Sequence, residues 1–95
     1  MAKRDLGVFA ISVAARMTSL QIQNLRVYEK RGLVAPDRTS GGTRLYSEDD
    51  IDRLHRIREL LARGLNLAGI AAVLDLEDEN ERLRDEVERL GGDDD

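Results

Sequence analysis

Amide and cationic side chains cluster in one stretch of the sequence, residues 20–31. A helix over this stretch, turning about 100° per residue, directs Leu25 inward and places Ile22, Tyr28 and Glu29 within ~60° of it. The outward and flanking positions hold Gln23, Asn24, Arg26, Lys30 and Arg31. Amide and guanidinium groups can read base edges in a DNA groove, and Lys30 and Arg31 are suited to phosphate. This face is a candidate for nucleic-acid recognition, although any solvated helix has a polar outer face.

A second group of candidates flanks the glycine pair at 41–42. Arg38 precedes the pair, and Thr43, Arg44 and Tyr46 follow it. Glycine lets cations and hydroxyl groups approach a phosphate backbone without a bulky side chain in the way. Taken alone, the same residues also fit an ordinary glycine-rich turn with unrelated arginines.

Two short helices are expected to carry the first group. Ser12 stands where an N-cap belongs, before a helix over 13–17, and Ser19 can cap the next helix, over 20–31. Gly32 follows in the position of a left-handed C-terminal residue. Two short helices joined by a turn of three or four residues make a helix-turn-helix.

Short extended segments are expected around the second group. Residues 9–11 are apolar and partly β-branched, which favours a brief strand. Pro36 ends any helix, the polar loop 39–43 follows, and residues 44–46 can return as a strand. The sequence therefore predicts a hairpin, or wing, beside the second helix.

The second half of the chain is predicted to be helical. Ser47 and Asp50 form a capping pair at the start of a helix that ends at Gly64, and Asn66 caps a further helix over 67–74. Beyond it, apolar residues and one asparagine recur at alternating spacings of three and four, a heptad seam formed by Val73, Leu76, Asn80, Leu83, Val87 and Leu90. A helix with only this stripe needs a partner, so the seam predicts a homodimer, with Asn80 as a register device.

Composition narrows the class of protein. The 95 residues carry a net charge of −4, but residues 1–46 hold eight basic and three acidic residues, whereas residues 77–95 hold three basic and ten acidic ones. This asymmetry is typical of a chain with one end that meets phosphate. The high charge and 3% aromatic content favour a mainly helical fold. No apolar stretch approaches the ~20 residues of a membrane span, so we expect no membrane partner and a cytoplasmic, nucleoid-associated location.

Several kinds of chemistry are not expected. The chain has no cysteine and one histidine, His55, which predicts no metal site and no cofactor. The acidic residues lie at helix starts and solvated faces, without a nucleophile–base pair, so we expect no catalytic residues and no enzyme.

Two stretches of the sequence together show a specific resemblance to a known protein family. The stretch Arg26-Val27-Tyr28-Glu29-Lys30-Arg31-Gly32-Leu33-Val34-Ala35-Pro36-Asp37-Arg38, followed by Gly42-Thr43-Arg44-Leu45-Tyr46, resembles the signature of MerR-family regulators. The similarity extends over roughly residues 9–90. Segments 38–42 and 64–70 look most like the HspR-type heat-shock repressors. Most members carry two adjacent aromatic residues after the helix arginine, and Val27 stands in the first of these two places, so base preference there is expected to differ.

The resemblance implies a winged helix-turn-helix with a dimerising helix. By this similarity, 1–8 is a flexible N-terminus, 9–75 the DNA-binding domain, 76–90 a dimerisation helix that forms a coiled coil, and 91–95 a disordered acidic tail. The second helix would enter the major groove of double-stranded DNA, with Gln23 and Asn24 nearest the bases. The phosphate backbone would be clamped by Arg26 and Tyr28 of that helix together with Arg38, Arg44 and Tyr46 of the wing.

These features predict a sequence-specific transcriptional regulator, a dimeric repressor on an inverted repeat. The chain stops about one helix past the winged domain, which predicts control by a protein co-regulator, by abundance or by temperature rather than by an effector pocket. A cooperative architectural DNA binder stays open as an alternative. So does a protein-interaction adaptor or antitoxin that uses the acidic helix.

Overall fold

The computed structural model describes residues 3–91 and is mainly helical, with one small antiparallel sheet. The chain divides after Gly64 into two compact units. The elements, in chain order, are β1 (Phe9–Ala10), α1 (Ile11–Thr18), α2 (Ile22–Lys30), β2 (Asp37–Arg38), β3 (Arg44–Tyr46), α3 (Glu48–Ala62) and α4 (Leu67–Gly91). The winged helix-turn-helix with a long C-terminal helix is confirmed.

The helix-turn-helix forms with different caps from those the sequence predicts. Ser12 lies inside α1, whose N-cap is Ala10 without a side-chain hydrogen bond, because β1 continues directly into the helix. Ser19 does not cap α2. It ends α1 in a left-handed conformation with φ 56°, and α2 begins after the extended Gln21. At the other end of α2, Gly32 adopts φ +76°, the conformation that glycine allows without a steric penalty.

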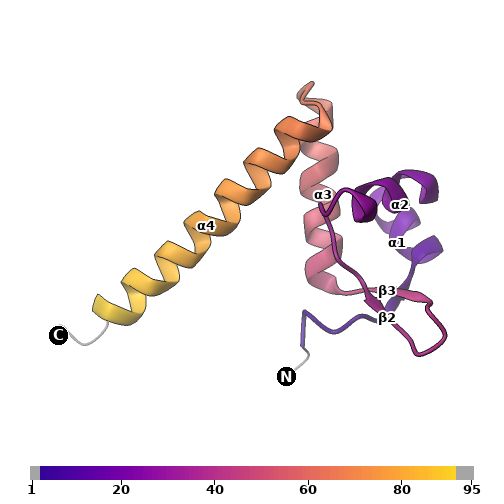
Figure 1. The fold of residues 1–95 in the computed structure, drawn as a ribbon, viewed down its shortest axis with the longest axis horizontal. Helices are drawn as coiled ribbons and strands as arrows, with labels where there is room; N and C mark the ends of the chain where they lie inside the picture. The colour runs from indigo at the N-terminus through magenta and orange to yellow at the C-terminus, as the bar shows by residue number, and fades with distance from the viewer. Residues whose placement is uncertain (1–2, 92–95) are drawn as a thin grey trace. The chain divides into compact units, whose positions relative to one another are not determined.

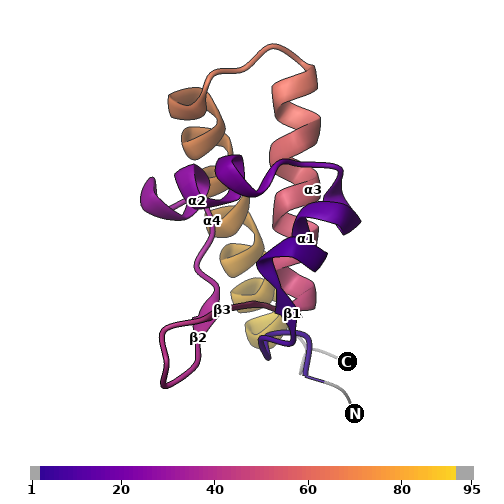
Figure 2. The ribbon, with the colours of Figure 1, turned by 90° about the vertical axis from the view of Figure 1, so that its right-hand side faces the viewer.

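The wing, residues 37–46, is the hairpin formed by β2, β3 and their connecting loop. β3 is the central strand, pairing with β1 on one edge and β2 on the other. Thr39 closes the loop, because its hydroxyl and its carbonyl oxygen accept hydrogen bonds from the N–H groups of Thr43 and Gly42, at 3.1 and 2.9 Å. Both views of the ribbon place α2 and the wing loop on the same side of α3 (Figures 1 and 2).

Within the N-terminal stretch 1–8, which the sequence predicts to be flexible, Gly7 and Val8 are hydrogen-bonded to the wing. The N–H of Val8 donates to the carbonyl of Tyr46 at 3.0 Å, and the N–H of Gly7 donates to the carboxylate of Asp37 at 3.0 Å. A Cβ atom at Gly7 would lie 2.5 Å from the neighbouring strand's backbone, so only glycine fits there. Pairing with the wing holds these residues in place, and the local sequence contains no periodic pattern that would predict this pairing.

Arg4 fastens the same stretch to the start of α3. Its backbone carbonyl accepts a hydrogen bond of 3.0 Å from the N–H of Asp49. Its guanidinium pairs with the carboxylates of Glu48, Asp49 and Asp52 in the first turns of the helix. The hydrogen bond to Asp49 and the charge of Asp52 raise the pKa of Arg4, which stays charged in any case.

The core of the first unit lies between its three helices and the sheet. α1 packs against α2, α3, β1 and β3. The predicted capping box at the start of α3 is confirmed: Ser47 and Asp50 exchange hydrogen bonds of 2.9 and 3.0 Å between side chain and backbone. The helices contribute fully buried side chains, among them Leu25, Leu54 and Ile57. This core fixes α2 and the wing on one scaffold.

The second unit is formed by α4 and the short segment before it. Asn66 caps α4 as predicted, with its side chain accepting from the N–H of Gly69 at 2.8 Å. The structure has no break at 75/76, where the sequence predicts a domain boundary; the helix is continuous over Leu67–Gly91. Its early residues Ile70 and Leu74 are buried.

Two further predictions concern the ends of the chain and the membrane. Of the predicted acidic tail, 91–95, Gly91 is the last residue of α4 and the others lie outside the described residues. Within residues 3–91, no helix is both long enough and apolar enough to cross a bilayer.

Candidate nucleic-acid interface

The outer face of α2 is polar and open to solvent, as the sequence predicts. Leu25 and Tyr28 are buried and anchor the helix to the core. The exposed positions include the predicted base-reading and phosphate-binding residues, Gln23, Asn24, Arg26, Lys30 and Arg31. A helix held by its inner face and free on its outer face has the form needed to enter a major groove.

The wing arginines are held by one carboxylate that comes from α2. Glu29 accepts from the Nη2 of Arg38 through Oε2 at 2.9 Å, and from the Nε of Arg44 through Oε1. Arg38 also donates through Nη1 to the carbonyl of Gly42 at 2.9 Å. Burial alone would raise the pKa of Glu29, but the hydrogen bonds from the two arginines outweigh it and lower that pKa below its usual value.

Four cations from α2 and the wing line one surface hollow together with this carboxylate. A surface hollow is lined by Arg26, Glu29 and Lys30 of α2 and by Arg38 and Arg44 of the wing. Arg26 and Lys30 have no ion-pair partner within the described residues. With four positive charges against one negative charge, the hollow attracts an anion such as a phosphate group.

Both tyrosines of the predicted set lie inside the fold. Tyr28 is 4% exposed and Tyr46 is completely buried, and burial raises the pKa of both hydroxyl groups. The Tyr46 hydroxyl has no hydrogen-bond partner within residues 3–91. Thr43, by contrast, is exposed in the wing loop. The two rings therefore differ from the rest of the predicted phosphate contacts, because the protein itself covers them.

Sequence reasoning missed two residues that shape this surface. Glu29 is assigned to the inner side of the helix wheel, but it connects α2 to the wing. Asp37, read only as part of a motif, fixes the start of β2 to Gly7. A signal for Glu29 does exist, because it is the single acid among Arg26, Lys30 and Arg31.

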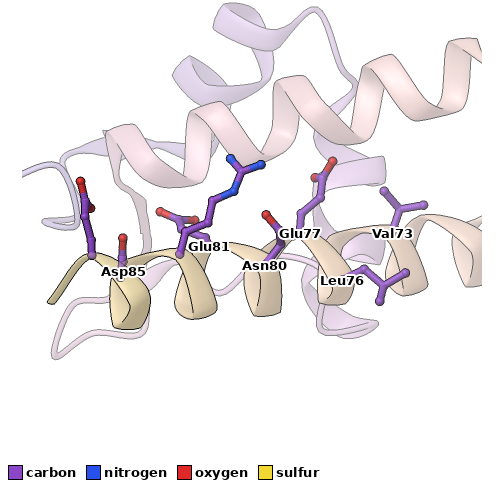
Figure 3. Close-up of a pocket in the computed structure, with 8 residues that line it drawn as sticks. Val73, Leu76, Glu77, Asn80, Glu81 and Asp85 are labelled. Carbon is purple, nitrogen blue, oxygen red and sulfur yellow. The ribbon is translucent and has the colours of Figure 1, made fainter. Parts of the chain in front are cut away.

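The predicted seam residues follow one side of α4. Figure 3 labels Val73, Leu76 and Asn80 on successive turns, where they line a shallow groove together with charged neighbours. Leu76, Leu83, Val87 and Leu90 are exposed, and Val73 is half-buried. An apolar stripe open to water over four turns indicates a surface that another molecule covers.

Comparisons with known proteins agree with this geometry. Residues 9–77 match the family described as "MerR HTH family regulatory protein". The chain is 44% identical over 81 residues to a heat shock protein HspR of Streptomyces coelicolor, covering 84% of this chain and 54% of that protein. It is 43% identical over 72 residues to the HTH-type transcriptional regulator GlnR of Bacillus anthracis, covering 76% and 56%. The chain thus spans about half the length of these relatives.

A solved structure supports the same assignment. The transcription regulator PbrR691 from Ralstonia metallidurans, crystallised with lead(II), superposes with a TM-score of 0.72 at 33% identity. The match covers 78% of this chain and 59% of that one. Since the family match spans most of the winged unit and continues into α4, the chain belongs to the MerR family of helix-turn-helix regulatory proteins.

Proposed function

We propose that this protein is a sequence-specific, DNA-binding transcriptional regulator that acts as a homodimeric repressor on an inverted repeat. The observation that carries the proposal is the convergence of Arg26 and Lys30 from α2 with Arg38 and Arg44 from the wing on one hollow. A phosphate held there fixes the register of α2 on the duplex. Gln23 and Asn24, on the exposed face of the same helix, then read base edges.

The other predicted residues take supporting roles in this proposal. Arg31 and Thr43, both exposed, contact neighbouring phosphates. Tyr28 and Tyr46 act from inside, because their buried rings fix α2 and β3 in place. The names of the relatives, a heat shock protein and a transcriptional regulator, are consistent with control of transcription.

The homodimer is proposed from the seam on α4. Two recognition helices must reach successive major grooves, about one helical turn apart, for a symmetric operator to be read. Pairing of two copies through Val73, Leu76, Asn80, Leu83, Val87 and Leu90 supplies that symmetry and removes apolar surface from water. The acidic sides of α4 outside the seam remain available to a protein co-regulator.

Selection of bound fragments from genomic DNA tests this function. We expect an inverted repeat with half-sites about one helical turn apart. Replacing Arg26 or Arg44 by alanine should weaken binding and make the slope of log affinity against log salt shallower by ~0.9 for each phosphate that the variant no longer neutralises. Arg82→Ala on α4 removes the same charge outside the hollow and is the matched control.

The alternatives predict different results in the same experiment. A footprint that lengthens with protein concentration indicates an architectural DNA binder instead of an operator-specific repressor. If no sequence is preferred over bulk DNA and neither arginine variant weakens binding, the DNA-binding function is wrong and a protein-interaction role for the acidic helix gains support.

A further inference from the structure

Glu29 holds two arginines from different strands with its two oxygen atoms. Oε2 accepts from the Nη2 of Arg38 at 2.9 Å, and Oε1 accepts from the Nε of Arg44. The Glu29 side chain is 18% exposed, much less than is usual for a surface carboxylate. An acidic residue at a surface that binds phosphate is electrostatically unfavourable, so its presence requires a compensating role.

The hydrogen bonds leave several donors of both arginines available. Arg44 uses only Nε, so its two terminal nitrogens have no partner among residues 3–91. Arg38 donates one hydrogen from each of Nη1 and Nη2. Its Nε has no partner in that part of the chain. Guanidinium donors lie in one rigid plane, so fixing one edge of the group aims the remaining donors.

An arginine side chain loses much rotamer freedom when it is ordered. If the free protein already holds Arg38 and Arg44 in place, less freedom is lost when a phosphate binds. Glu29 also comes from α2, so the same contact sets the wing at a fixed distance from the helix that faces the bases.

We propose that Glu29 is a positioning residue for DNA recognition: it aims the free donors of the two wing arginines at one backbone phosphate and couples the wing to α2. This inference rests on the proposed DNA-binding function. Glu29 does not itself touch the phosphate. It remains ionised at neutral pH, since the two arginines hold its pKa below the usual carboxyl value.

The direction in which one substitution changes DNA affinity distinguishes a positioning role of Glu29 from a simple effect of its charge. Glu29→Gln removes a negative charge beside the phosphate, so electrostatics alone predicts tighter DNA binding. Positioning predicts weaker binding, by about tenfold, because the amide no longer orients both guanidinium groups. Glu29→Asp keeps the charge but is one methylene shorter, and positioning predicts the same weakening. Binding to the selected operator is measured at ~0.15 M salt.

Glu59→Gln on α3 is the matched control, because Glu59 also pairs with an arginine, Arg56, but lies outside the hollow. It removes the same charge, and we expect operator affinity to stay equal or rise slightly. Thermal unfolding of every variant identifies any loss of folded protein. An unchanged or tighter operator affinity for Glu29→Gln, with the variant folded, overturns the positioning role.

A second measurement needs no DNA. In the wild-type protein, NMR should show a slowly exchanging Nε–H proton on Arg44, which Glu29→Gln accelerates and Glu59→Gln does not. Equal exchange rates in all three proteins overturn the proposal. If the wild-type protein binds no DNA, the proposed function fails together with this role. If it binds and Glu29→Gln binds equally well, only the positioning role fails.

Discussion

The two units of the chain differ in how far their apolar side chains are exposed to water. In the first unit, Leu25, Leu54 and Ile57 are completely buried. On α4, Leu76 is 70% exposed and Leu90 is 71% exposed, although both occupy regular helical spacings. The first unit therefore closes its own core, whereas the apolar stripe along most of α4 is left open to water by the described residues. Helical periodicity alone does not distinguish a face that packs within the chain from one that packs against another molecule.

The ion pairs of the two units also differ, in sequence separation and in exposure to water. Glu29 in the first unit holds two arginines that are distant in sequence and is 18% exposed. On α4, Arg82 pairs with Glu79 and Glu86, three and four residues away, and its side chain is 60% exposed. Long-range pairs fix tertiary geometry, while exposed pairs within one helix add little stability. The comparison separates a unit fixed by long-range contacts from a helix whose apolar stripe we propose to be an association surface.

The largest expected effect is on stability, from the removal of a side chain in the core of the first unit. Leu54→Ala should lower the free energy of unfolding of the first unit by about 2–5 kcal/mol, because it leaves a cavity at a fully buried site. Denaturant unfolding followed by tyrosine fluorescence reports this unit selectively, since Tyr28 and Tyr46 both lie in it. Leu76→Ala on α4 is the control. If both variants unfold alike, the contrast between the units is wrong.

A smaller effect is expected at the seam. Leu83→Ala should weaken the proposed homodimer by at least about tenfold, or ~1.4 kcal/mol, because each copy would then bury less apolar area in the interface. Sedimentation over a range of concentrations measures this change. Arg82→Ala, next to Leu83 in sequence but outside the groove that Val73, Leu76 and Asn80 line, should leave association unchanged. A monomer at every concentration in the wild-type protein would refute pairing through α4.

The smallest effect concerns pH. The lowered pKa of Glu29 means that its ion pairs stabilise the folded state above the unfolded carboxyl pKa of about 4.3, and this contribution is lost as pH falls through the lowered folded value. The stability difference between wild type and Glu29→Gln should therefore be present at pH 7 and vanish in acid. Thermal unfolding of both proteins over a series of pH values measures this difference.

Glu79 provides the comparison from the other unit. The hydrogen bond from Arg82 also lowers the pKa of Glu79, but the pair is exposed to water. Glu79→Gln should change stability little at any pH, because solvent screens such pairs. Equal pH profiles for the Glu29 and Glu79 variants would show that the partly buried contact of Glu29 stabilises the fold no more than an exposed pair does.

The sequence predicted correctly those features that depend only on residues close together in the chain. The Ser47–Asp50 capping box, the Asn66 cap and the left-handed Gly32 depend on neighbours within a few residues, and all three are confirmed. Propensity placed the caps of α1 and α2 on Ser12 and Ser19, but the strand pairing of β1 and the extended Gln21 moved both helix starts.

The amino-acid sequence alone determined the helix-turn-helix, the wing, the charge asymmetry and which side chains α2 turns outward, because these follow from periodicity and turn chemistry. Only the tertiary structure decided that Glu29 joins Arg38 and Arg44, that Arg4 and Gly7 tie the N-terminal stretch to the fold, and that Tyr46 lies inside. Contacts between residues 9–48 positions apart depend on how the elements pack, and no local pattern records that packing.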